Sequence, residues 1–108
     1  MDTKKEAILK EMGDIPEEFY YELVREFLSD AFGQIDSLES SLKGGDIESA
    51  KRTIHSIKGV SANLRLNDIC QLSKEVEADI KNGLGFDEIA GKVDAMRSIL
   101  VRLSDEVD

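Results

Sequence analysis

The single histidine of the chain, His55, and two residues that follow it form the group best suited to chemistry. Lys58 and Gly59 come three and four residues later, which places both beside the ring if this segment is a helix. A glycine inside a helix costs about 1 kcal/mol relative to alanine, so its presence needs a reason. Residue 59 would lie over the imidazole if it had a side chain. The glycine therefore predicts a ring nitrogen that a reactant can reach.

The spacing of apolar residues around His55 predicts the helix. Apolar or small residues recur at alternating intervals of three and four, which is typical of one buried stripe: Ile47, Ala50, Ile54, Ile57, Ser61 and Leu64. At about 100° per residue, His55 projects away from this stripe toward solvent. Four basic residues are expected around it: Lys51, Arg52, Lys58 and Arg65.

The segment HSIKG at residues 55–59 resembles the signature of histidine phosphotransfer (HPt) domains, the phosphorelay modules of two-component signalling. Small residues and then Asn63-Leu64 follow it, as in that family. Downstream, Ile69, Leu72 and the pair Val76-Glu77 are similar to the family's leucine-rich helix. The resemblance covers roughly residues 14–104. Arg65 and Val60 depart from the family pattern, which usually has glycine and a smaller residue there.

The resemblance implies a phosphoryl carrier in which Nε2 of His55 attacks an aspartyl phosphate and later passes the phosphoryl group to another aspartate. Lys58, with Arg52 as a weaker candidate, would neutralise phosphoryl oxygens. The implied partners are response-regulator receiver domains and a hybrid histidine kinase. The chain needs no cofactor of its own in this interpretation, since Mg²⁺ belongs to the receiver. It has no glycine-rich nucleotide loop, so autonomous kinase activity is not expected.

Glu77 is expected to lie opposite His55. If the two helices turn back near residue 66, positions 55 and 77 are equidistant from the turn and face each other. A carboxylate that accepts the Nδ1 proton would leave Nε2 as the free nucleophile. The alternative is a surface acid that pairs with Lys81, four residues later on the same helix.

Long periodic segments with short connections predict an all-α fold, an antiparallel up-down-up-down four-helix bundle with a short N-terminal flanking helix. One domain is expected over residues 1–108, with the flanking helix in 1–13 and the bundle core in 14–107. Glycines at 44, 45 and 83 mark the turns, and Asp46 caps the helix that carries His55. The last helix has the clearest heptad pattern: Phe86, Ile89, Val93, Met96, Leu100, Leu103 and Val107.

Composition narrows the function classes. The 108 residues carry a net charge of −9, which disfavours binding to nucleic acid or to an anionic membrane surface. A single cysteine, Cys70, permits no internal disulfide and is expected to be a packed small residue. No apolar run approaches the length of a membrane span. A cytoplasmic monomer is the expectation.

Three alternatives stay open at this point. The chain fits the first, phosphoacceptor domain of a chemotaxis-type histidine kinase equally well, and a non-catalytic helical adaptor would leave His55 without a role. A metal site is disfavoured because a single histidine has no cluster of cysteines or acids around it.

Phe32 lies about 100° from the centre of its helix's apolar stripe. It either stands exposed and contacts a receiver, with Lys51 and Arg52 steering, or packs against the flanking helix.

Overall fold

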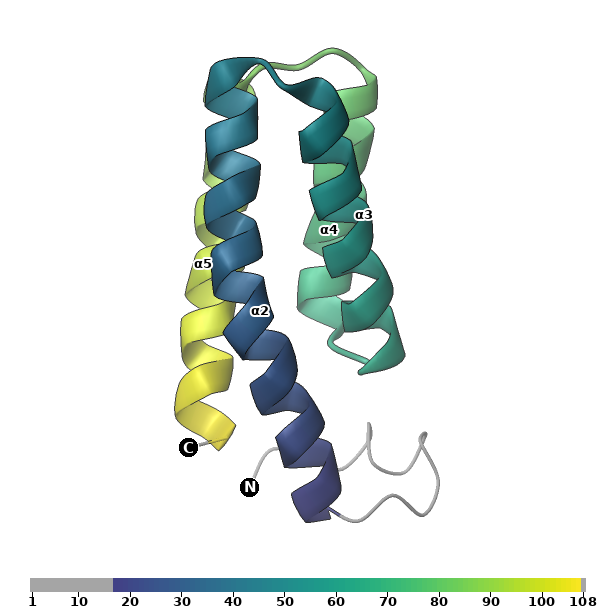
Figure 1. Ribbon diagram of the computed structural model, residues 1–108, viewed down its shortest axis with the longest axis vertical. Coiled ribbons are helices and arrows are strands. Elements are labelled where there is room, and N and C mark those ends of the chain that lie inside the picture. Colours follow the sequence, from purple (N-terminus) through teal and green to yellow (C-terminus); the bar gives the residue numbers. More distant parts are fainter. Residues whose placement is uncertain (1–16, 108) are drawn as a thin grey trace.

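Four helices follow one another in the computed structural model, which describes residues 17–107 (Figure 1). They are α2 (Glu17–Gly44), α3 (Ile47–Asn63), α4 (Asn67–Lys81) and α5 (Phe86–Val107). No strand occurs within this range. The all-α fold is therefore confirmed, while the predicted flanking helix in residues 1–13 lies outside the described residues.

The helices run alternately up and down, and each packs against its neighbours in the chain. α5 packs back against α2 and closes the bundle, and α3 and α4 form the most closely packed pair. The two outer helices of the sequence, α2 and α5, extend beyond the turn between α3 and α4 (Figure 1). This is the predicted antiparallel four-helix bundle.

All three turns between helices have the same ending. The residue after each helix cap takes a left-handed backbone: Gly45 (φ 75°), Arg65 (φ 58°) and Gly83 (φ 81°). In each turn the next backbone N–H donates to a carbonyl five residues earlier: Asp46 to Ser41 (2.8 Å), Leu66 to Ser61 (2.9 Å) and Leu84 to Asp79 (3.0 Å). This is the Schellman motif. Arg65 keeps the turn without glycine, although a left-handed backbone costs a residue with a side chain roughly 1–2 kcal/mol.

The core follows the predicted stripes, except at Ile47 and at positions that are only half-buried, among them Leu72, Phe86 and Leu103. Ile47 is the first residue of α3 and remains 39% exposed, so its predicted burial is wrong. In α4, Leu72 is half-buried and Ser73 is fully buried in its place, because α4 is covered by both α3 and α5. The Ser73 hydroxyl donates to the carbonyl of Ile69 (2.8 Å), so its burial leaves no unpaired polar group. Cys70 is buried, as predicted.

Two further findings bear on function. Phe32 is half-buried and packs against the bundle core, so of its two predicted alternatives the exposed ring is not found. The other alternative, packing against the flanking helix, lies outside the described residues. None of the helices within residues 17–107 combines the length and the apolar character that a membrane crossing requires.

Candidate functional site

The site begins with α3, which holds His55 on its solvent side. Asp46 starts the helix, because its side chain accepts a hydrogen bond from the backbone N–H of Ser49 (3.2 Å). Ile54 and Ile57, which flank the histidine in sequence, are buried against the rest of the bundle. The imidazole between them faces outward and is 74% exposed. The predicted orientation of His55 is therefore present.

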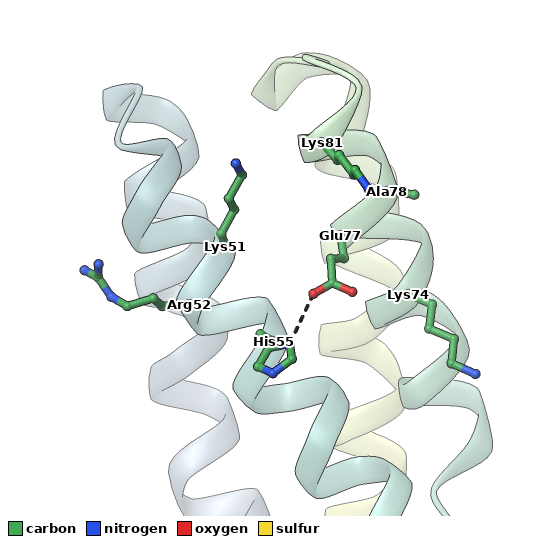
Figure 2. Close-up of a pocket in the computed structure, with 7 residues that line it drawn as sticks. All are labelled: Lys51, Arg52, His55, Lys74, Glu77, Ala78 and Lys81. Atoms are coloured by element: carbon green, nitrogen blue, oxygen red, sulfur yellow. Dashed lines mark hydrogen bonds and ion pairs between the residues drawn. The ribbon is translucent and has the colours of Figure 1, made fainter.

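Glu77 reaches His55 from α4. Its Oε2 lies 3.3 Å from Nδ1 of the imidazole, and Figure 2 shows this contact crossing the space between the two helices. Its other oxygen, Oε1, accepts a hydrogen bond from Nζ of Lys58 (2.5 Å). The turn at residue 66 thus places positions 55 and 77 face to face, as the sequence indicated. Within the described residues, Glu77 makes no ion pair with Lys81 and is bound to α3 instead.

The charge of Glu77 decides which ring nitrogen carries the proton. The hydrogen bond from Lys58, and to a lesser extent the one with His55, lowers the pKa of Glu77 below its ordinary value of 4.5, against an opposing effect of burial. At neutral pH this side chain is a carboxylate, which only accepts hydrogen bonds. Nδ1 must therefore be the donor, and a neutral imidazole then has its lone pair on Nε2.

Lys58 differs from the prediction in its partner. Its ammonium binds Oε1 of Glu77, the carboxylate whose other oxygen contacts the ring. The sequence predicted an ammonium beside the imidazole, but it did not predict Glu77 as the partner of that ammonium. The carboxylate on α4 competes for that ammonium, and this competition arises only after α3 and α4 have packed.

Gly59 leaves open space on the exposed side of α3. A side chain begun at this position would meet no atom within 4 Å outside its own helix segment. The glycine therefore does not serve close packing between helices. This agrees with the interpretation that it keeps the approach to His55 clear, although a role in function stays a prediction.

A cleft runs between α3 and α4 beside His55 and Glu77. Its other lining residues are mostly basic: Lys51, Arg52, Lys74, Ala78 and Lys81. Figure 2 shows the guanidinium of Arg52 pointing away from the imidazole, so this candidate does not contact the ring. Arg65 does not line the cleft, because ten residues of helix separate it from His55, about 15 Å along the axis. Its predicted place around the histidine is wrong.

Sequence reasoning did not assign to the site the two lysines that α4 contributes, Lys74 and Lys81, although it named Lys81 as an alternative partner of Glu77. The signal was available, because residues 74, 77, 78 and 81 follow the spacing of three and four that marks one helical face. Once Glu77 was placed opposite His55, the same face brought both lysines to the cleft.

For the alternative of a metal site, residues 17–107 hold no group of three or more histidine, cysteine or acidic side chains placed to bind an ion.

The model of the Hpt domain family matches residues 22–107 of the chain. The chain belongs to the Hpt domain family. Hpt domains carry phosphoryl groups on histidine in two-component phosphorelays, without kinase activity of their own. Their partners in these relays are response regulators. Neither the search of curated proteins nor the search of solved structures finds a match to this chain. The part matched as an Hpt domain contains α3, α4 and α5 in full, and with them every residue of the site.

Proposed function

We propose that this Hpt domain accepts a phosphoryl group on Nε2 of His55 and passes it reversibly to or from the aspartate of response-regulator receiver domains. One observation carries the proposal. The only imidazole of the chain is exposed on the bundle surface, with Nδ1 held by a carboxylate and with no partner on Nε2 among residues 17–107.

In the proposed step, the Nε2 lone pair attacks the phosphorus of an aspartyl phosphate. The N–P bond forms while the P–O bond to the aspartate breaks, and the electron pair leaves on the aspartate as a carboxylate. The ring then holds phosphorus on Nε2 and the proton on Nδ1, so it gains positive charge. Glu77 stabilises that charge because its carboxylate already accepts from Nδ1. Transfer to a second receiver is the reverse of this step.

Lys58 and Arg52, the two basic residues proposed to contact the phosphoryl group, would do so in different ways. Lys58 is 27% exposed and bound to Glu77, so it neutralises phosphoryl oxygens only by sharing its ammonium between the carboxylate and the phosphoryl group. Arg52 must first turn toward the ring. The receiver, with its own Mg²⁺, supplies the remaining stabilisation in this proposal. A chemotaxis-type kinase would use the same imidazole with a kinase domain as donor.

The test is phosphotransfer from a panel of phosphorylated receiver domains to the wild type and to His55→Gln. Wild-type protein should gain a phosphate that is labile in acid and stable in base, as a phosphohistidine is. His55→Gln should show the same helical circular dichroism, because the side chain is exposed, and should accept none.

Phosphate that persists on His55→Gln, or that survives acid treatment, would contradict the assignment. A wild type that no receiver labels but an added kinase domain does label would favour the chemotaxis-type alternative. A wild type that neither labels would favour the adaptor.

A further inference from the structure

The cleft beside His55 collects cations that have no carboxylate partner. Several lysines and arginines in residues 17–107 form ion pairs, as Lys92 does with Asp79 (2.6 Å) and Arg97 with Asp36 (2.9 Å). Within the part of the chain that the structure describes, five have no ion pair: Lys51, Arg52, Lys74, Lys81 and Arg102. The first four all line the cleft. In a chain of net charge −9, this concentration indicates a surface for an anionic ligand.

The neighbouring helix α2 has the opposite net charge. Acidic residues on α2 outnumber basic ones seven to two. Asp36 and Glu39 pair with Arg97 of α5, and the other five are Glu17, Glu18, Glu22, Glu26 and Asp30. An acidic partner that approaches His55 is therefore attracted by the four cations of the cleft, whereas the two cations of α2, Arg25 and Lys43, are bound to Val107 and Glu39. The charge pattern therefore favours docking over the cleft between α3 and α4 rather than over α2.

We propose that the cleft between α3 and α4 receives an acidic surface of the partner receiver, and that Lys74 and Lys81 on α4 determine its affinity and selectivity. This rests on the proposed function, because the partner must carry the aspartyl phosphate. His55 lies in the lining of the same cleft, so a partner seated there covers the phosphoacceptor. The docked partner then lies over α3 and α4 rather than over α2.

The four cations stand on both walls of the cleft, as Figure 2 shows, with Lys51 and Arg52 on α3 and the two lysines on α4. All four are exposed at the surface. Exposed charges of this kind accelerate encounter and reject partners of the wrong charge more than they change the chemical step. The expected effect of removing them is therefore on the second-order rate constant of transfer, with the rate inside the complex unchanged.

The experiment compares the wild type with K74Q/K81Q, with K74R/K81R, which keeps the charge, and with Arg102→Gln as matched control. Arg102 is also an exposed, unpaired cation but lies on α5, outside the cleft. Transfer from a phosphorylated receiver should lose about tenfold in kcat/KM in K74Q/K81Q at low salt. Its dependence on salt concentration should become shallower, kcat should hold, and the other two variants should match the wild type.

A second donor separates this proposal from the proposed function. Phosphoramidate phosphorylates imidazole without docking, so it should label wild type and K74Q/K81Q at equal rates. Equal kcat/KM with the receiver in both proteins, or an equal loss in Arg102→Gln, would overturn the docking proposal and leave His55 as acceptor. Failure of both donors to label the wild type on His55 would overturn the proposed function and the docking proposal together.

Discussion

At the scale of single residues, one carboxylate organises the site. Glu77 contacts Nδ1 of His55 with one oxygen and the ammonium of Lys58 with the other. About a third of its side chain is exposed (32%), so water screens both contacts and they add little to folding stability. Their effect is on protonation and orientation: the ring keeps its proton on Nδ1, and the lone pair falls on Nε2.

The acidity of Glu77 gives a prediction that isolates Lys58. The Lys58 hydrogen bond is the largest cause of the lowered pKa of Glu77. Stability from a lowered carboxyl pKa is present above the ordinary value of 4.5 and is lost as the pH falls through the lowered one. A carbon-13 NMR titration should find the Glu77 midpoint below 4.5 in the wild type and closer to 4.5 in Lys58→Met. The control is Lys74→Met, which removes from α4, the helix of Glu77, a lysine that has no ion pair among the described residues. This control should not change the Glu77 midpoint. Equal midpoints in all three proteins would contradict the contact.

The sequence predicted the pair His55 and Glu77 because two helices joined by one short turn have a fixed register. It did not predict the partner of Lys58 or the direction of Arg52. Long side chains choose among rotamers of similar energy, and the choice depends on charges that only the packed helices bring near. Lys74 and Lys81 were predictable from the same register, and their contribution to the cleft follows from the position of Glu77.

At the scale of the element, one face of α3 packs into the core and the opposite face carries the candidate site. Ala50, Ile54, Ile57 and Ser61 are buried on one face, while His55 and Gly59 are exposed on the other. Helix ends were predictable where the turn residue is glycine, as at Gly45 and Gly83. Arg65 gave no such local signal, since arginine is a good helix former. Tertiary packing of Leu64 and Leu66, both buried, fixes the left-handed turn between them.

Substitution of Gly59 tests this division of faces. Since nothing lies within 4 Å of an added Cβ, Gly59→Ala should raise the free energy of unfolding by up to about 1 kcal/mol through helix propensity. Gly59→Gln should also keep or raise stability. Its longer side chain should cover the imidazole and slow phosphotransfer severely, with alanine in between. Melting temperature and transfer rate are measured on the same two variants. Unimpaired transfer in Gly59→Gln would show that the glycine has no role in access to the ring.

At the scale of the whole molecule, α2 is hydrogen-bonded to the ends of α3 and α5. The Tyr20 hydroxyl donates to the carbonyl of Leu64 at the end of α3 (3.4 Å), and Arg25 donates to the carbonyl of Val107 at the end of α5 (2.9 Å). These contacts join residues 44 and 82 positions apart in the sequence. Local periodicity predicts which helices form and which faces they bury. It carries no information on a hydrogen bond between the first helix described and the last.

The contact of Arg25 gives a prediction about stability alone. α5 has no basic residue in its last turn, so the guanidinium from α2 supplies the positive charge that its terminal carbonyls favour. Arg25→Met should lower the free energy of unfolding by about 1 kcal/mol, measured by urea denaturation. Gln34 of α2 bonds Ser56 beside the histidine (3.2 Å), so Arg25 lies about 14 Å along the helix from the site. Phosphotransfer should therefore be unchanged.

The control is Arg102→Met, which removes an arginine without an ion pair from the same end of the bundle. Its free energy of unfolding should stay within about 0.5 kcal/mol of the wild type. Equal destabilisation in both variants would mean that the Arg25 contact does not hold the end of α5.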